Sequence, residues 1–193
     1  MTDVSRETRE QLDHFKALVV DENQRQNLVS PASIAEFDTR HIEDAVQLAE
    51  LGKAGTWCDV GSGAGFPGIV IALITRAPMT LIEPRRLRAD FLRRAVAELD
   101  LDATVVELKA ERVPDHFDNI TARALAELSK LFSITEHLAQ RGTRWILPKG
   151  QSAQMELAAA QQSWQGVFTL VPSRTSEAAM IIVAEGLRRR AKR

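Results

Sequence analysis

The stretch that most constrains the fold is 57–68, WCDVGSGAGFPG, in which an apolar run containing one acid is followed by four glycines and a proline. Glycine permits backbone conformations with positive φ and lets a ligand approach the backbone closely. Pro67 suits the first turn of a helix. The stretch therefore predicts a strand, a ligand-binding loop over 61–67 and a helix.

Short apolar runs alternate with helical patterns through the rest of the chain. We expect strands over 56–60, 79–83, 103–108, 118–124 and 144–148, and helices over 68–76, 85–99, 125–141 and 151–164. Two closing runs, 166–171 and 178–185, are joined by too few residues for a crossover helix, so they are expected to pair antiparallel. The alternation predicts a doubly wound α/β domain with helices on both faces of a mostly parallel sheet.

The first part of the chain has a different pattern. Residues 1–52 are expected to form a helical extension, with helices over 4–22 and 32–50, ahead of an α/β domain over 53–193. In the expected helix over 85–99, an inward stripe is assigned to Leu87, Phe91, Leu92, Ala95 and Leu99.

Composition excludes several classes of protein. The single cysteine, Cys58, rules out an intramolecular disulfide, and no cluster of residues suggests a metal. No stretch approaches the roughly 20 apolar residues that span a membrane, and the charged N-terminus lacks a secretory pattern. A cytoplasmic location is expected. The net charge of −1 does not indicate a nucleic-acid binder, although arginines are concentrated over 85–94 and 188–190.

The glycines fit two fingerprints that predict different chemistry. Read from Gly61, they match the G-x-G-x-G of methyltransferases that use S-adenosylmethionine. Read from Gly63, they match the dinucleotide fingerprint G-x-G-x-x-G. Glu83 lies 20 residues after Gly63, at the end of the second expected strand. An acid there holds ribose hydroxyls in either case, so Glu83 does not discriminate between the two cofactors.

Asp59 and Phe66 favour the frame that begins at Gly61. A carboxylate beside the loop would repel a pyrophosphate and attract a sulfonium. An aromatic ring would crowd a pyrophosphate at the helix N-terminus, but it can pack against apolar atoms of a cofactor. S-adenosylmethionine, held by a loop that includes Gly65, is therefore the predicted cofactor, and Gly68 is expected to let the following helix pack closely. The alternative, an NAD(P)-dependent oxidoreductase, would lack the tyrosine-lysine acid of one dehydrogenase class, because the chain has no tyrosine.

Motifs spread along the chain resemble the RsmG (GidB) family of bacterial ribosomal RNA small-subunit methyltransferases. They are NLVS at 27–30, RHIEDA at 40–45, DVGSGAGFPGI at 59–69, ARA at 122–124 and LPKG at 147–150. The glycine loop alone would indicate only a methyltransferase, whereas Arg-His-x-x-Asp, Phe-Pro-Gly and the late Lys-Gly are together specific. The family often has serine where this chain has Ala45 and Ala122.

The resemblance implies a fold and an activity. The fold is a Rossmann-like class I methyltransferase, with a seven-stranded, mostly parallel sheet and a helical N-terminal extension. The activity is S-adenosylmethionine-dependent methylation of guanine N7 in the 530 loop of 16S rRNA, at guanine 527. The cofactor positions that carry over are Gly61, Gly63, Phe66, Glu83, Ala110, Glu111 and Arg123. The implied partner is 16S rRNA, free or in the small ribosomal subunit or its precursor, and we expect a monomer. A non-catalytic ribosome-binding module is a further alternative.

This chemistry needs no general base, because guanine N7 presents a free lone pair on the major-groove edge. Catalysis then depends on positioning and electrostatics. Arg123 and Lys149 follow the fourth and fifth expected strands and are the candidate catalytic residues, each able to hold guanine O6 or a phosphate. Arg40 and Asp44 share a helix face. They are expected either to form an ion pair that docks the extension or to contact RNA, and the sequence supports both interpretations equally. The arginines over 85–94 and 188–190 are candidates for contacts to the RNA backbone.

Overall fold

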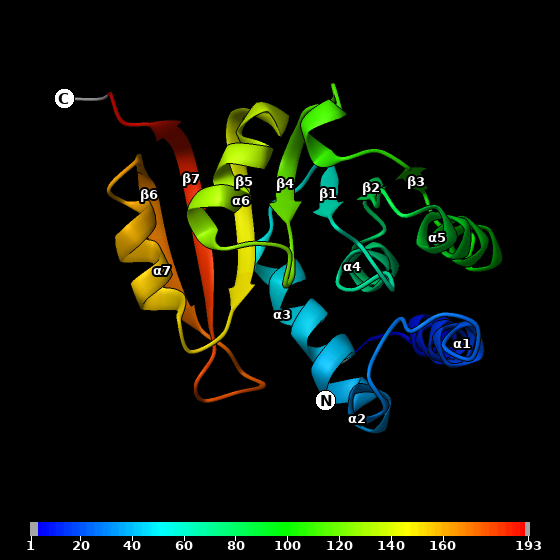
Figure 1. Cartoon of the computed structure of the whole chain (residues 1–193). Coiled ribbons are helices and arrows are strands. Elements are labelled where there is room, and N and C mark those ends of the chain that lie inside the picture. The colour runs from blue at the N-terminus through cyan, green and yellow to red at the C-terminus, as the bar shows by residue number, and fades with distance from the viewer. Residues whose placement is uncertain (1–3, 192–193) are drawn as a thin grey trace.

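The computed structural model describes residues 4–191 and has a seven-stranded sheet at its centre (Figure 1). The strands are β1 (Trp57–Val60), β2 (Met79–Ile82), β3 (Ala103–Val106), β4 (Phe117–Thr121), β5 (Ala139–Lys149), β6 (Trp164–Pro172) and β7 (Met180–Arg189). Their order is β3-β2-β1-β4-β5-β7-β6, and only the pairings of β7 with β5 and β6 are antiparallel. The predicted mostly parallel sheet with an antiparallel closing pair is confirmed.

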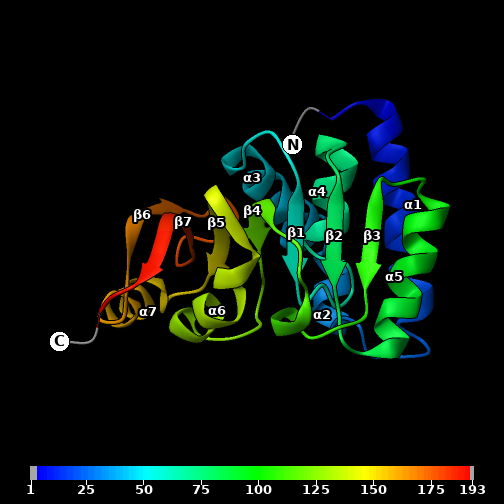
Figure 2. The same cartoon turned by 90° about the horizontal axis from the view of Figure 1, so that it is seen from above.

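Helices cover both faces of the sheet. They are α1 (Arg6–Glu22), α2 (Pro31–Ala35), α3 (Asp44–Leu51), α4 (Gly68–Thr75), α5 (Arg86–Glu98), α6 (Leu128–Thr135) and α7 (Ala153–Ala160), with a π-helical turn η1 (Asp38–Glu43) and 3₁₀ turns η2 (Ala110–Arg112) and η3 (Glu136–Leu138). Figure 2 shows α6 and α7 on the face opposite to α3 and α4. One apolar core lies on each face: α1, α3, α4 and α5 contribute to the first, and α6 and α7 to the second.

The expected helix over 32–50 is broken into three pieces. Ser30 caps α2, accepting a hydrogen bond from the Ser33 N–H, and Pro31 occupies its first turn. The chain then passes through η1 before it continues as α3. A π-helical turn inside a helix is rare and often marks a functional site. Here it brings the buried His41 towards the glycine loop.

Two other expectations about helices were wrong. The helix expected over 125–141 is shorter, because Ala139 already pairs with Phe117 of β4 and starts β5. Pairing within the sheet overrides the local helical pattern there. Leu87 is 70% exposed rather than inward. The buried stripe of α5 includes Ala89 and Leu92, and a residue two positions before Ala89 points to roughly the opposite side of a helix.

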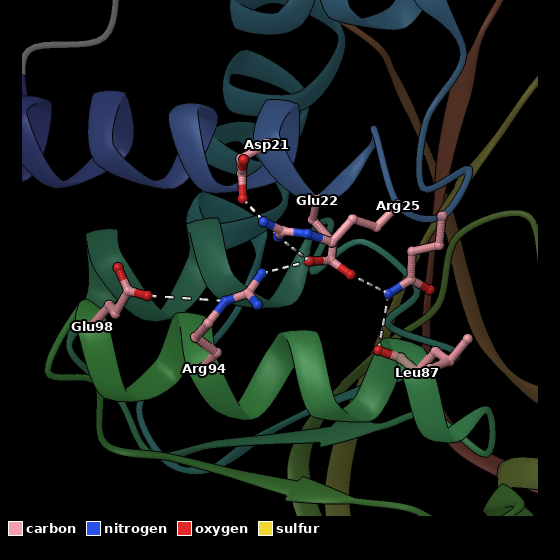
Figure 3. A network of polar contacts seen from close by, with 7 residues as sticks. Asp21, Glu22, Arg25, Leu87, Arg94 and Glu98 are labelled. Atoms are coloured by element: carbon pink, nitrogen blue, oxygen red, sulfur yellow. Dashed lines mark hydrogen bonds and ion pairs between the residues drawn. The ribbon is translucent and has the colours of Figure 1, made fainter.

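The N-terminal helices share their core with the sheet domain. Phe15 of α1 and Leu48 of α3 belong to the same buried cluster as Ile69 of α4. At the end of α1, Glu22 accepts hydrogen bonds from Arg94 of α5, at 2.6 Å, and from Gln26, whose amide also donates to the Leu87 carbonyl (Figure 3). The apolar core is thus continuous across residue 52. The division of the chain into two parts at this residue stays a prediction.

Within residues 4–191, no helix has both the length and the apolar character needed to cross a lipid bilayer. The same residues contain no group of three or more His, Cys, Asp or Glu side chains that could hold a metal ion.

Candidate active site

The loop after β1 is built around glycines in the left-handed region. Gly61 and Gly63 have φ values of 76° and 56°, which L side chains rarely adopt. The Gly63 N–H donates to Glu83 Oε2 at 3.0 Å, and Glu83 Oε1 accepts from the Arg85 N–H at 2.9 Å. Glu83 is 4% exposed at the end of β2. These bonds fix the carboxylate against the glycine loop, where the sequence placed it.

A cavity of about 450 Å³ opens beside this loop, and we call it the glycine-loop cavity. Five of the predicted site residues line it: Gly61, Gly63, Phe66, Glu83 and Arg123. The lining also includes residues that the sequence did not assign to the cofactor, among them Leu28, Val29, Arg85, Arg88 and Leu125. Asp59, Gly65, Ala110, Glu111 and Lys149 lie outside this lining.

Asp59 lies under the loop rather than in the cavity. It is 1% exposed, and its Oδ2 accepts from the Gly68 N–H at 3.1 Å, at the N-terminus of α4. Burial raises the pKa of Asp59 to about 7, although the Gly68 hydrogen bond acts in the opposite direction. The carboxylate therefore caps α4, and direct contact between Asp59 and a cofactor stays a prediction.

Packing requires glycine at two positions, Gly65 in the loop and Gly68 at the start of α4. A Cβ on Gly68 would lie 2.5 Å from Leu81 Cδ2, so the expectation that this residue lets α4 approach the sheet is confirmed. A Cβ on Gly65 would lie 2.9 Å from Phe15 Cζ. Gly65 thus admits the N-terminal helix α1 against the loop.

Phe66 joins the loop to the N-terminal extension. Its ring stacks on His41 with a centroid distance of 4.2 Å, and it contacts Phe15 and Phe37 at 5.1 and 5.3 Å. Phe66 is 4% exposed. The aromatic residue that sequence reasoning assigned to the cofactor therefore also anchors α1 and η1 at the edge of the cavity.

Arg123, in the loop after β4, is held by η1. Its Nη2 lies 3.0 Å from His41 Nδ1, its Nη1 donates to the Arg40 carbonyl at 3.2 Å, and its guanidinium lies 5.7 Å from the Phe66 ring centroid. Burial lowers the pKa of Arg123, opposed by the charges of Asp44 and Asp59. An arginine remains protonated in a protein despite such a shift.

His41 is the partner that orients this guanidinium. Burial, together with the charges of Arg123 and Arg40, lowers the pKa of His41 to about 4. The imidazole is therefore neutral at pH 7, so Nδ1 can accept from Arg123 while Nε2 donates to Ser33 Oγ at 2.9 Å. Sequence reasoning missed this role, because no local signal relates His41 to a residue on a distant strand end.

The expected ion pair between Arg40 and Asp44 does not form. Arg40 pairs with Glu36, whereas Asp44 accepts from Thr175 Oγ1 and from Gln47 Nε2. The π-helical turn has more residues per turn than an α-helix, so positions four apart across it no longer share a face. The structure thus assigns Asp44 to a contact with the connection between β6 and β7.

Lys149 lies at the end of β5, and its ammonium group donates two hydrogen bonds to other residues of the protein. Its Nζ donates to the Ala126 carbonyl and to Glu156 Oε2, both at 2.8 Å. It lines a second cavity of about 420 Å³, the α3–β5 cavity, which shares Arg123 and Ala124 with the glycine-loop cavity. Lys149 therefore fixes the loop that carries Arg123, and its contact with substrate stays a prediction.

The remaining predicted residues, Ala110 and Glu111, do not line the glycine-loop cavity. The Ala110 carbonyl is 3.1 Å from His137 Nε2, and Glu111 is exposed. Of the arginines over 85–94, Arg85 and Arg88 line the glycine-loop cavity. Arg93 instead pairs with Asp90 and Glu107.

The arginines over 188–190 lie at the opposite edge of the sheet from the glycine loop, because β7 runs antiparallel to β5. Arg189 pairs there with Glu136, and Arg190 Nε donates to the Gln161 carbonyl at 2.8 Å.

Comparison with known proteins assigns the family. The family model for GidB, rRNA small subunit methyltransferase G, matches residues 8–176. A ribosomal RNA small subunit methyltransferase G from Gluconobacter oxydans is 44% identical, over 98% of this chain and 99% of that protein. One from Sphingopyxis alaskensis is 41% identical, over 91% of this chain and 78% of that protein.

Solved structures resemble the chain in fold. A SAM-dependent methyltransferase from Aquifex aeolicus superimposes with a TM-score of 0.61 at 14% identity, over 88% of this chain and 97% of that one. MtNAS in complex with MTA and tNA gives the same TM-score at 14% identity, over 92% and 70% of the two chains. The fold is therefore that of the Rossmann-like class I methyltransferases. Together with the family match over most of its length, this shows that the chain belongs to the rRNA small subunit methyltransferase G family.

Proposed function

We propose that this protein transfers a methyl group from S-adenosylmethionine to N7 of a guanine in 16S rRNA, guanine 527 of the 530 loop. The observation that carries the proposal is that Gly63, Glu83 and Arg123 line one cavity at the carboxyl ends of β1, β2 and β4. Ligands of doubly wound sheets bind at this edge. Membership of the methyltransferase G family supports ribosomal RNA as the substrate.

The residues present fit the cofactor. Glu83 offers a buried carboxylate that can accept hydrogen bonds from ribose hydroxyls, and the Gly61 and Gly63 backbone leaves the loop surface free of Cβ atoms. Leu28 and Leu125 add apolar walls, and Arg88 adds a positive charge suited to a carboxylate. S-adenosylmethionine supplies an electrophilic methyl group on a sulfonium.

The chain's own residues provide positioning rather than acid–base chemistry. The N7 lone pair forms the new bond to carbon while the carbon–sulfur pair leaves with sulfur, so no proton has to be removed. His41 is neutral, and both of its ring nitrogens already have partners in Arg123 and Ser33. Arg123 retains further N–H donors for guanine O6. A positioned donor of this kind favours the transition state by electrostatics.

The setting follows from this reaction. We propose that the protein acts as a monomer in the bacterial cytoplasm, where its RNA substrate is found, free or within the small subunit or its precursor. Lys149 contributes by holding the Arg123 loop through the Ala126 carbonyl. Direct contact between Lys149 and a phosphate would require it to leave Glu156.

Thermal shift distinguishes the proposed cofactor from the alternatives. We expect S-adenosylhomocysteine to raise the Tm and NAD to leave it unchanged, because binding to the folded state alone stabilises it. The opposite result would favour an oxidoreductase. Labelled S-adenosylmethionine should then transfer its methyl to unmodified 16S rRNA, and a protein that binds the cofactor but transfers nothing would be a ribosome-binding module instead.

A further inference from the structure

The α3–β5 cavity is built by several segments that meet at the edge of the sheet. They include the loop after β4 with Arg123, the end of β5 with Lys149, the connection over 173–179, and α3 with Asp44. Gln47 ties α3 to that connection, because its Nε2 donates to Ser173 Oγ at 3.2 Å and its Oε1 accepts from the Arg174 N–H at 2.9 Å. Its volume of about 420 Å³ lies in the range of small-molecule sites.

Charges in this cavity lie on two different walls. Arg123 is on the wall shared with the glycine-loop cavity. Asp44 is on α3, and both hydrogen bonds that the described residues make to its carboxylate, from Thr175 and Gln47, reach Oδ1. The other carboxylate of the cavity, Glu156, already accepts from Lys149, Ser152 and the Leu128 N–H. Among the carboxylate oxygens of this cavity, Asp44 Oδ2 is therefore the one that accepts no hydrogen bond from the described residues.

Apolar side chains complete the walls. Pro148, Met180 and Ile181 line the cavity between the end of β5 and the start of β7. Methionine and branched aliphatic side chains can pack against the face of a planar ring. The cavity thus combines a donor on one wall, an acceptor on another and apolar surface between them.

We infer that the α3–β5 cavity receives the target guanine, extruded from the RNA, with its Watson–Crick edge towards Asp44, its O6 towards Arg123 and its N7 free to face the methyl donor. The inference rests on the proposed function and adds to it the residues that select the base. Guanine carries an acceptor at O6 and donors at N1 and N2, which complement a guanidinium on one side and a carboxylate on the other, while the N7 lone pair stays free for methyl transfer. Enzymes that modify a base commonly take it out of the stack in this way.

The same arrangement discriminates against adenine. In adenine the N6 amino group stands beside N7, where it would meet the donor Arg123, and N1 is an acceptor that would meet the Asp44 carboxylate. Unpaired polar groups of this kind are strongly disfavoured in a site built for hydrogen bonds. Asp44 also favours the reaction electrostatically. The base gains the positive charge that the sulfonium loses, and a nearby carboxylate stabilises that charge.

The test combines a protein variant with a change in the base. Asp44→Asn keeps an oxygen for the Thr175 and Gln47 bonds but replaces the other acceptor with a donor. Asp38→Asn is the matched control, because Asp38 lies on the neighbouring turn, pairs with Lys16 and lines none of the cavities described above. The substrates are small subunits reconstituted with 16S rRNA that carries guanosine or inosine at the target position. Inosine lacks only the N2 amino group.

We expect the wild type to prefer guanosine over inosine by about 10-fold or more in kcat/KM. Asp44→Asn should lower kcat/KM on guanosine by about 10- to 100-fold and bring the guanosine-to-inosine ratio close to one. The Kd for S-adenosylhomocysteine should stay within about threefold of the wild type, and Asp38→Asn should behave as the wild type, since neither change reaches the glycine-loop cavity.

Each failure has its own signature. An Asp44→Asn variant that retains both the rate and the guanosine preference overturns the pocket assignment and leaves the proposed function intact. A wild type that methylates no guanine in 16S rRNA overturns both. If Asp44→Asn does not fold, the wild type alone decides, because equal rates on guanosine and inosine would contradict the pocket.

Discussion

His41 Nδ1 lies 3.0 Å from Arg123 Nη2, and the same imidazole stacks on Phe66 at a centroid distance of 4.2 Å. These three residues come from η1, the loop after β4 and the glycine loop, which are distant in the sequence. The contact explains why the helical extension is folded against the sheet at this place. His41 holds the guanidinium that lines both the glycine-loop cavity and the α3–β5 cavity.

Replacing His41 with phenylalanine should reduce the rate of methyl transfer without weakening the binding of the cofactor. The phenyl ring can still stack on Phe66, but Arg123 and Ser33 lose their hydrogen-bond partners. We expect kcat to fall about 10-fold, because an arginine donor is no longer held in position, while the Kd for S-adenosylhomocysteine stays within about threefold. Steady-state kinetics and calorimetric titration measure the two quantities.

A conservative replacement separates positioning from packing. The side-chain oxygen of His41→Asn can take the place of Nδ1 as an acceptor, so this variant should recover part of the lost kcat. Ser33→Ala removes only the more distant partner and should have a smaller effect. Equal rates in His41→Phe and the wild type would contradict the positioning role.

The lowered pKa of His41 makes a prediction for stability against pH. The pKa is about 4 in the folded protein, below the ordinary value of 6.5, so between these values the unfolded chain binds more protons. Stability from this residue is therefore present above pH 6.5 and is lost as the pH falls towards 4. The His41→Phe variant should lack this loss. The slopes of unfolding free energy against pH for the wild type and the variant should differ by at most about 1.4 kcal/mol per pH unit. Urea unfolding from pH 6.5 to 4.5 measures it, and parallel curves would exclude it.

Asp59 should show the opposite dependence. Its pKa is raised to about 7 in the folded protein from an ordinary value of 3.8, chiefly by burial, so the folded state binds more protons in this window. The wild type therefore loses stability from this residue as the pH rises from about 4 to 7. Asp59→Asn cannot ionise and should gain stability relative to the wild type over that range. If the difference in unfolding free energy between the wild type and Asp59→Asn does not change with pH, the pKa of the buried Asp59 carboxyl is not raised.

Glu22 should be the polar residue on which docking of α1 to α5 depends most. Its side chain is 9% exposed and pairs with Arg94 and Arg25 (Figure 3). Burial raises its pKa, but hydrogen bonds from Arg94, Gln26 and Arg25 outweigh this and leave the pKa below its ordinary value. Glu22→Gln should lower the free energy of unfolding by about 1–3 kcal/mol, since it weakens the charge-assisted hydrogen bonds that Arg94 and Arg25, both partly exposed, make to this buried carboxylate.

A neighbouring acid provides the matched control for Glu22. Asp21 pairs with Arg25 from an exposed position on the same helix, and exposed pairs of this kind contribute only about 0.3–0.5 kcal/mol. Asp21→Asn should therefore have a small effect in the same urea titration. A similar loss of unfolding free energy in both variants would show that Glu22 stabilises the protein no more than the exposed Asp21 does.

Much of the fold can be read from the sequence because its signals are local. The alternation of apolar runs with helical patterns predicts every strand, and the short connection between the last two predicts their antiparallel pairing. The start of β5 could not be read in this way. Ala139 lies in a helical pattern, and only its pairing with Phe117 makes it part of a strand.

The site divides in a similar way. The glycines, Glu83 and Arg123 can be identified because they follow strand ends, where a doubly wound sheet gathers its ligand contacts. The contacts of His41 with Phe66 and of Asp44 with Thr175 depend on how the helical extension packs, which no periodicity reveals. Asp59 shows the limit most clearly: an acid beside the loop in sequence lies beneath it in space and caps α4.

The most direct test of the proposed function is to map the methyl group that the protein transfers. Unmodified 16S rRNA, free and within small subunits, is incubated with the wild-type protein and labelled S-adenosylmethionine, and is then treated with borohydride and aniline, which cleave the chain at N7-methylguanosine. We expect label in 16S rRNA and one new cleavage, at guanine 527 of the 530 loop. Label on another atom, at another base or in another RNA would refute the proposed function.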